Sequence, residues 1–186
     1  LVNTLSGEAK KEVHFVVLAF LRPTRVWWPE EFSADNQPLC ASDDGKMPIQ
    51  DLNRVTNPQR GPCDECPQAR FGPDGKAPRC KRQRNFLIFD LDTQEPLILT
   101  LQSTAMSAAR HLTTLARTKG LRYGLVMRTM KVKDARGQWF IPTFSVGERL
   151  DAETVHSLIQ IRDELAPLLE RVTADTGEDT VSADTI

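Results

Sequence analysis

Residues 33–84 limit the possible folds of this chain more than any other segment. They show no apolar periodicity, and they hold seven of the twelve prolines, four of the ten glycines and all four cysteines. An irregular stretch of about 50 residues inside a compact domain needs something other than a hydrophobic core to organise it. The cysteines are the candidates for that role, in the spacing C-x22-C-x2-C-x13-C at Cys40, Cys63, Cys66 and Cys80.

Four clustered cysteines could form two disulfides or ligate one metal ion. The apolar run 13–21 follows charged residues and has no small-residue cleavage site after it, so we expect no signal peptide and a reducing compartment. Cys63 and Cys66 can both reach one tetrahedral ion, and Cys40 and Cys80 would close the site. The spacing therefore favours a structural Zn²⁺ that folds the stretch. A redox Cys-x-x-Cys pair and unrelated free cysteines are the alternatives.

Regular elements are predicted on both sides of this stretch. We expect strands over residues 13–21, 85–91, 97–101, 121–132 and 139–146, with a polar hairpin loop over 133–138. A helix capped by Ser103 or Thr104 should run to about Thr118 and end at Gly120. A last helix should begin near Asp151, with Pro167 kinking or splitting it.

Five strands with one helix between the third and fourth predict a mainly β chain of the α+β class. This is the layout of an OB-fold-like five-stranded barrel, a fold that binds oligonucleotides across one face. We expect residues 1–150 to form that domain, with residues 33–84 as its zinc-stabilised insert. Residues 151–173 should form a C-terminal helix, and residues 174–186 an acidic, disordered tail. The apolar runs are too short to predict a membrane span.

The charge is distributed unevenly along the chain. Residues 148–186 hold ten acidic and three basic residues, a net charge of −7, whereas the whole chain carries −1. The preceding residues are therefore basic, and residues 54–84 alone hold eight basic and three acidic residues. A basic body favours an anionic partner. Scattered charge with a solvated acidic helix is the alternative reading.

Aromatic residues lie close to the basic residues in the sequence. Cations follow the phosphates of single-stranded nucleic acid while rings stack on its bases, so this combination predicts such binding. In an extended segment, one of Trp27 and Trp28 should face inward and the other outward. Phe140 and Phe144 are expected in the core. The candidate nucleic-acid-binding residues are Arg25, Trp27, Trp28, Arg70, Phe71, Lys81, Arg82, Arg84, Arg122, Tyr123, Arg128, Lys131 and Trp139.

The sequence contains no motif that predicts catalysis. It has no G-x-x-x-x-G-K-[ST], G-x-G-x-x-G or H-E-x-x-H, and its serines, histidines and aspartates stand in no nucleophile setting. We therefore predict a protein that is not an enzyme and that binds single-stranded DNA or RNA. The alternative is a zinc-knuckle scaffold subunit of a larger replication, transcription or CRISPR-type nucleoprotein complex.

Three sequence elements resemble a family of phage single-stranded DNA-binding proteins. They are Cys40 to Gly45 (CASDDG), then Gly61 to Pro67 (GPCDECP), then Cys80-Lys81 before a strand. The upstream Trp27-Trp28-Pro29 is similar to that family's W-P element. Residues 96–105 (PLILTLQSTA) are similar to its strand-to-helix step, with Ser103-Thr104 in inverted order. The resemblance covers about residues 22–147.

The resemblance implies an OB-like barrel with a zinc-stabilised insert that coats single-stranded DNA during replication or recombination. It also implies that the acidic tail, with Asp175, Glu178, Asp179 and Asp184, recruits replication or recombination proteins and competes with DNA. The tail ends in Thr185-Ile186 without a terminal aromatic residue, and a purely solubilising tail is the alternative. Self-association on DNA and a cytoplasmic location, in a bacterial host if the chain is phage-encoded, are further expectations.

Overall fold

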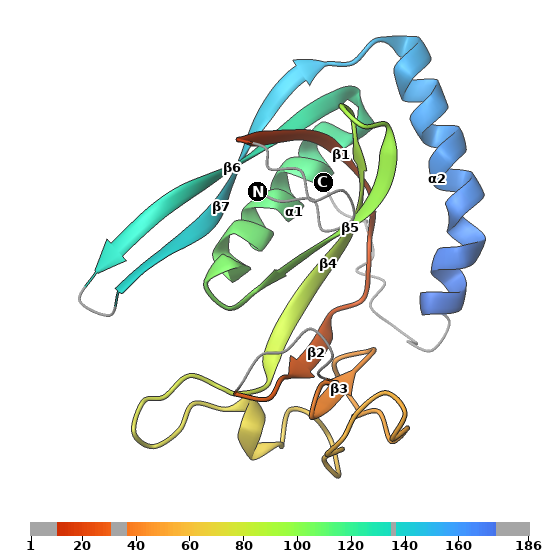
Figure 1. Ribbon diagram of the computed structural model, residues 1–186. Coiled ribbons are helices and arrows are strands. Elements are labelled where there is room, and N and C mark those ends of the chain that lie inside the picture. The colour runs from red at the N-terminus through yellow and green to blue at the C-terminus, as the bar shows by residue number, and fades with distance from the viewer. Residues whose placement is uncertain (1–10, 31–36, 135–136, 174–186) are drawn as a thin grey trace, which may run out of the picture.

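The computed structural model describes residues 11–30, 37–134 and 137–173 (Figure 1). Within them, seven strands and two α-helices form. The strands are β1 (Glu12–Phe20), β2 (Thr24–Trp27), β3 (Cys40–Ser42), β4 (Lys81–Asp90), β5 (Glu95–Gln102), β6 (Tyr123–Asp134) and β7 (Gly137–Arg149). The helices are α1 (Met106–Lys119) and α2 (Ala152–Thr173), with short 3₁₀ turns over Pro67–Ala69, Ser103–Ala105 and Gly120–Arg122.

All strand pairings in the sheet are antiparallel, and β4 lies at its centre. The order is β3-β2-β4-β1-β6-β7, with β5 on the other edge of β4. β1 pairs with the second half of β4, where Phe20 lies opposite Phe86, and β2 pairs with the first half, where Val26 lies opposite Lys81. β1 and β2 therefore follow one another along the same edge of β4 and connect the main sheet to the insert.

The sheet is open, whereas the sequence predicted a closed five-stranded barrel. In the described part of the chain no pairing joins β5 to β7, the two strands that would have to meet. Helix α1 lies beside β7 instead, where the His111 ring is 3.2 Å from the carbonyl oxygen of Phe144. The mainly β, α+β class is confirmed, and the closure of the barrel is not.

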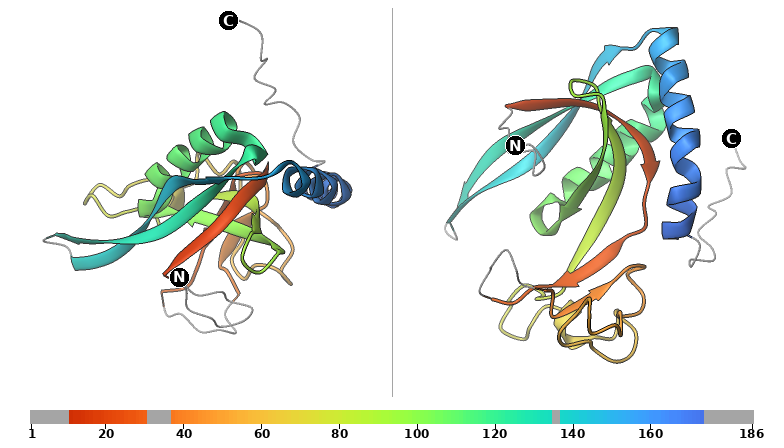
Figure 2. Two further views of the ribbon diagram at one scale, coloured as in Figure 1. Left: turned by 90° about the horizontal axis from the view of Figure 1, so that it is seen from above. Right: turned by 45° about the vertical axis from the view of Figure 1, so that its right-hand side comes forward.

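The two faces of the sheet support two separate hydrophobic clusters. Alternation along β1 and β4 sends Phe15 and Phe86 to one face and Val16 and Leu87 to the other. The first face packs against Leu112 of α1, and the second packs against α2. Two views show the helices on different sides of the strands (Figure 2). The central strands are thus buried on both faces.

The expected C-terminal helix begins where the sequence predicted. The Asp151 carboxylate accepts a hydrogen bond of 2.7 Å from the backbone N–H of Thr154, which satisfies one of the free donors of the first turn of α2. Pro167 lies inside α2, which continues past it as one element. The acidic tail, residues 174–186, lies outside the described residues.

Other local predictions need correction. Strand β2, which carries Arg25, was not among the predicted strands, and β4 begins at Lys81 instead of Asn85. The residue preceding α1 is Ala105, which has no side-chain cap, so neither Ser103 nor Thr104 caps that helix. β6 and β7 extend beyond their predicted ends and form a long two-stranded ribbon.

None of the described helices is long and apolar enough to cross a membrane.

Docking of α2 should make a measurable contribution to stability. Leu158 is almost completely buried against the sheet. Leu158→Ala should lower the free energy of unfolding by about 2–5 kcal/mol, because it removes a packed side chain and leaves a cavity. Urea denaturation measures this. His156→Ala changes an exposed residue of the same helix and should cost less than about 0.5 kcal/mol. Equal losses for the two variants would contradict the docking.

Candidate functional site

The first wall of the candidate site is the small sheet formed by β3, β2 and the start of β4. Trp27 lies opposite Cys40, and Arg25 lies opposite both Ser42 and Arg82. Alternation therefore places these residues on one face of the small sheet. Trp27 forms a buried cluster with Cys40 and Cys80, and Cys80 immediately precedes β4.

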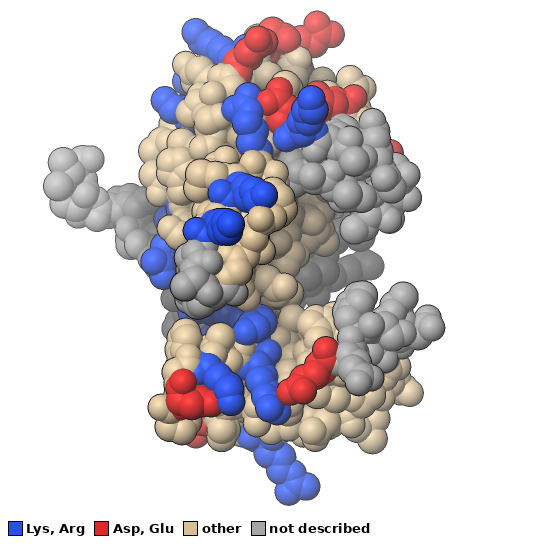
Figure 3. Space-filling model, turned by 60° about the vertical axis from the view of Figure 1, so that its left-hand side comes forward, with Lys and Arg blue, Asp and Glu red and all other residues tan. Residues whose placement is uncertain are grey.

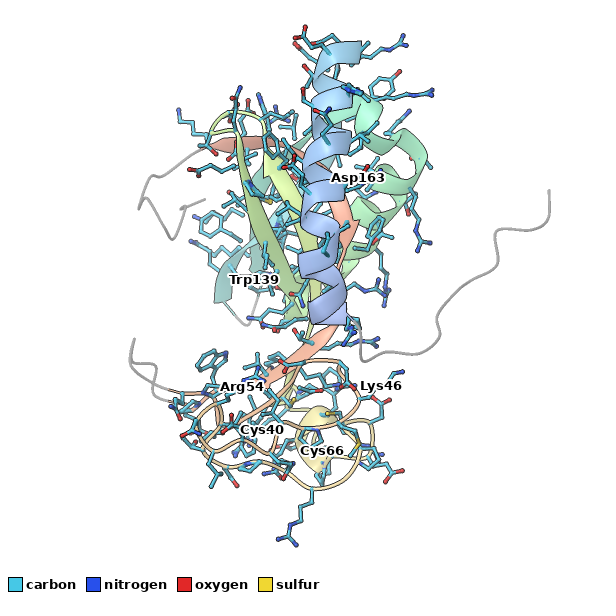
Figure 4. All side chains as sticks on the ribbon, turned by 90° about the vertical axis from the view of Figure 1, so that its right-hand side faces the viewer. Cys40, Lys46, Arg54, Cys66, Trp139 and Asp163 are labelled. Atoms are coloured by element: carbon cyan, nitrogen blue, oxygen red, sulfur yellow. The ribbon has the colours of Figure 1, made fainter. Side chains whose placement is uncertain are left out.

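The second wall is the Cys63–Cys66 turn, which folds back over that face. The backbone N–H of Cys63 donates to the carbonyl oxygen of Lys46 at 2.7 Å. The backbone N–H of Cys80 donates to the backbone carbonyl oxygen of Gln68 at 2.8 Å. The N–H of Cys66 donates to the carbonyl oxygen of Cys63 at 3.3 Å. These bonds bring together segments that are far apart in the sequence, and Figure 4 shows Cys40 and Cys66 within the same lobe.

All four cysteines line one small cavity. The cavity has a volume of about 10 Å³, and its other lining residues are Trp27, Pro48, Gln59, Gly61 and Gln68. All four cysteines are among the described residues, and each is a free thiol. The structure therefore brings the four predicted ligands together and shows no disulfide among them.

The donor set matches structural zinc in number and kind. Four cysteine sulfurs without an acidic or histidine side chain are a usual zinc ligand set. As placed, however, the side chains do not form a metal centre, since no three histidine, cysteine, aspartate or glutamate residues in the described ranges form a group that could hold a metal ion. Zinc therefore remains a prediction here.

The cysteines differ in how easily they ionise. Burial raises the pKa of Cys80 to about 11, and nearby Arg25 acts in the opposite direction. Burial also raises the pKa of Cys63, opposed by a hydrogen bond with Ser42 and by Arg25. Cys66 is more exposed than the other three. In the absence of metal, the buried thiols should therefore be poor nucleophiles at neutral pH.

Three of the predicted nucleic-acid-binding residues are engaged within the insert. Arg25 is 10% exposed in its side chain and pairs with the Asp64 carboxylate. Arg70 donates two hydrogen bonds, of 3.2 and 2.9 Å, to the backbone oxygen of Asp64. Trp27 is buried with the cysteines, so its predicted stacking on bases is wrong for this structure. Trp28 is 41% exposed, as the predicted inward and outward alternation requires.

The predicted residues that face solvent near the insert lie mainly at its junction with the sheet. Arg82 is exposed, Lys81 donates to the backbone oxygen of Pro78, and Phe71 is exposed further into the insert. Within the described residues, Nε and Nη2 of Arg22 and Nε of Arg84 are buried without hydrogen-bond partners. Arg22 is not among the predicted binding residues, because it stands outside the basic segment 54–84.

The β6–β7 ribbon carries a second set of candidates. Lys131 lies opposite Phe140, and Val132 lies opposite Trp139. Phe140 is 59% exposed, so its predicted place in the core is wrong, whereas Phe144 is buried as expected. Trp139 is partly buried. An exposed ring directly across from a lysine is suited to contact both a base and a phosphate.

The remaining candidates lie away from these two sets. Arg128 forms an ion pair of 2.7 Å with Glu12. Arg122 and Tyr123 are near the start of α2, since the N–H of Leu150 donates to the Arg122 carbonyl oxygen, and Lys119 lies over the Tyr123 ring at 5.4 Å. The structure therefore does not bring these three residues to the insert.

One face of the molecule displays an excess of basic side chains. In Figure 3, Lys and Arg appear both on the body of the sheet and on the insert below it, and the visible middle of this face shows no Asp or Glu. The side chains of Arg82, Lys131 and Lys133 are exposed. This face can therefore attract an anionic chain.

Comparison of the chain with protein-family models, with curated proteins and with solved structures finds no match.

The burial of the thiols predicts their order of alkylation. In metal-free protein at pH 8, iodoacetamide should modify Cys66 first, because it is the most exposed, and Cys80 last, because burial raises its pKa to about 11 and alkylation needs the thiolate. The rate at Cys80 should keep rising as the pH approaches about 11, its pKa. Time-resolved peptide mass spectrometry measures the order. Equal rates at all four cysteines would show that the cavity does not persist without metal.

Proposed function

We propose that this chain is a non-catalytic single-stranded DNA-binding protein. The observation that carries the proposal is an exposed ring beside a cation on the β6–β7 ribbon, where Phe140 lies opposite Lys131. A second exposed ring, Trp28, follows β2 at the junction of the insert and the sheet, where β2 pairs with the basic first half of β4. Rings that stack without reading base edges favour binding that tolerates any sequence.

The order of the long strands supports an OB-like arrangement. The order β7-β6-β1-β4-β5, with α1 between β5 and β6, matches the sequence prediction of one helix between the third and fourth strands. In OB-folds, the loop after the first strand and the loop between the last two strands flank the oligonucleotide. The insert and the tip of the β6–β7 ribbon occupy these two positions along the chain, so a strand of DNA would pass between them.

A structural Zn²⁺ held by Cys40, Cys63, Cys66 and Cys80 is part of the proposal. The ion would tie the Cys63–Cys66 turn to the small sheet and give the insert the stability that its small apolar cluster does not provide. A closed four-thiolate site leaves no position for a reactive water, so the metal would serve folding.

The scaffold-subunit alternative is favoured by one specific observation. Several insert cations are already engaged by acidic side chains or backbone oxygens of the insert itself, including Arg54 with Asp43 at 2.8 Å. Cations that are already paired are less available to phosphates, and a polar surface of this kind can form the rim of a protein interface.

Three further expectations depend on the same resemblance and belong to the proposal. They are binding of replication or recombination proteins by the acidic tail, self-association on DNA and a cytoplasmic location.

Fluorescence anisotropy of labelled oligo-dT, oligo-U and a duplex tests the proposed function. The zinc-loaded protein should bind oligo-dT tightly and duplex weakly, and the affinity should fall steeply with salt as counterions are released. Phe140→Ala and Trp28→Ala should each weaken oligo-dT binding by roughly 1–3 kcal/mol, because each removes a stacking ring. Leu52→Ala, which trims an exposed apolar residue of the insert, should have no effect.

The two functions give different outcomes in this titration. Absence of binding to every oligonucleotide at low salt would reject the DNA-binding proposal and direct attention to protein partners. Loss of affinity from Leu52→Ala equal to that from Phe140→Ala would contradict the stacking role.

Removing one cysteine tests the zinc proposal separately. Cys63→Ser should release zinc and lower the melting temperature, because the Cys63–Cys66 turn loses its tie to the small sheet. Metal analysis and thermal denaturation measure the two effects. A variant that keeps both its metal and its melting temperature would contradict the zinc site.

A further inference from the structure

Arg25 was expected to contact nucleic acid, but its side chain points into the insert. Only 10% of it is exposed, although β2 lies at the base of the insert. Its Nε donates to the backbone oxygen of Gly45 at 3.1 Å, and its Nη2 pairs with the Asp64 carboxylate. The two nitrogens on one edge of the guanidinium are thus both occupied, which leaves that edge unavailable to a phosphate.

The partners of Arg25 lie in two segments near cysteines. Gly45 follows β3, five residues after Cys40, and Asp64 stands between Cys63 and Cys66. Arg70 also holds Asp64, through the Asp64 backbone oxygen. Arg25 therefore connects the strand wall of the cysteine cavity to the turn wall.

The charge of Arg25 also suits the cavity. Four thiolates outweigh the charge of one Zn²⁺, so a zinc-loaded cavity is anionic overall and is stabilised by a nearby cation. Arg25 stands two residues before Trp27, which packs with Cys40 and Cys80, and its guanidinium reaches the Cys63–Cys66 turn through Asp64. A guanidinium keeps its charge when buried, whereas an ammonium can lose its proton.

We propose that Arg25 is a positioning residue of the four-cysteine metal site, and not a nucleic-acid contact. Its fork fixes the Cys63–Cys66 turn over Cys40 and Cys80 through Asp64 and Gly45, and its charge offsets that of the bound thiolates. This inference rests on the proposed zinc site. Residues that orient metal ligands in this way usually change metal affinity by about 10–100-fold when they are removed.

The chain offers a matched control for this ion pair. Arg54 pairs with Asp43 through both guanidinium nitrogens, at 2.8 and 2.9 Å, and both side chains are about half exposed. Figure 4 shows Arg54 in the same lobe as Cys40 and Cys66. Arg54→Gln therefore removes an insert salt bridge that has no link to the Cys63–Cys66 turn.

The experiment compares zinc retention in the full-length wild type, Arg25→Gln and Arg54→Gln by titration with a chromophoric chelator. Arg25→Gln should lose zinc with an apparent affinity about 10–100-fold weaker, and Arg54→Gln should match the wild type. Asp64→Asn changes an exposed side chain that a folded insert tolerates, and it should shift the affinity in the same direction by a smaller factor. Oligo-dT anisotropy of the zinc-saturated variants is the second readout.

Each outcome separates this inference from the proposed function. Equal zinc retention in Arg25→Gln and Arg54→Gln, in a wild type that holds zinc, would overturn the role of Arg25 alone. A zinc-saturated Arg25→Gln that loses oligo-dT affinity while retaining wild-type zinc affinity would return Arg25 to the nucleic-acid face and overturn the inference. A wild type that binds no zinc would overturn both the metal site and this role, whatever its affinity for DNA.

Discussion

The pairing of β4 along both of its edges is the constraint on which the rest of the structure depends. β5 covers one edge of β4 from Gln83 to Asp90, while β1 and β2 share the other edge. The second half of β4 carries the core residues Phe86 to Phe89, and the first half begins directly after Cys80. One strand therefore belongs both to the hydrophobic core and to the cysteine cavity, and the insert is attached to the sheet by backbone hydrogen bonds instead of by a flexible linker.

The composition of β4 explains why its two halves face different surroundings. Phe86, Leu87, Ile88 and Phe89 are apolar on both faces, which requires a helix on each side of the sheet. Lys81 to Arg84 cannot be fully buried in this way, so the sheet continues there without a covering helix, with Arg82 exposed and the other three side chains partly buried. The transition from core strand to basic surface thus takes place within ten residues of one strand.

Sequence reasoning found the elements whose signal is local. The β-branched and aromatic run of β1, the carboxylate of Asp151 before α2 and the inward and outward alternation of Trp27 and Trp28 all act within a few residues. It missed β2 and the start of β4, because arginine and lysine mask a strand whose stability comes from pairing with distant segments. The sequence prediction placed Phe140 in the core. Side chains alternate between the two faces of a strand in the same way whether the strand lies over the core or extends past it, so the pattern alone does not show where the core ends. The link between Arg25 and Asp64 spans 39 residues and has no local pattern at all.

The net charge of the insert is a poor guide to the surface that it offers to an anion, because several of its cations are already paired. Arg54, Lys76 and Arg79 pair with Asp43, Asp74 and Glu30, and Arg70 is occupied by a backbone oxygen. These ion pairs help to hold the insert together, although each exposed pair contributes little to the free energy of folding by itself. Arg82, on the β4 segment that joins the insert to the sheet, is exposed, whereas Nε of Arg84 is buried there without a hydrogen-bond partner. A count of basic residues therefore overstates the surface available to an anion, and exposed Arg82 and Lys131 place part of that surface at the junction and on the β6–β7 ribbon.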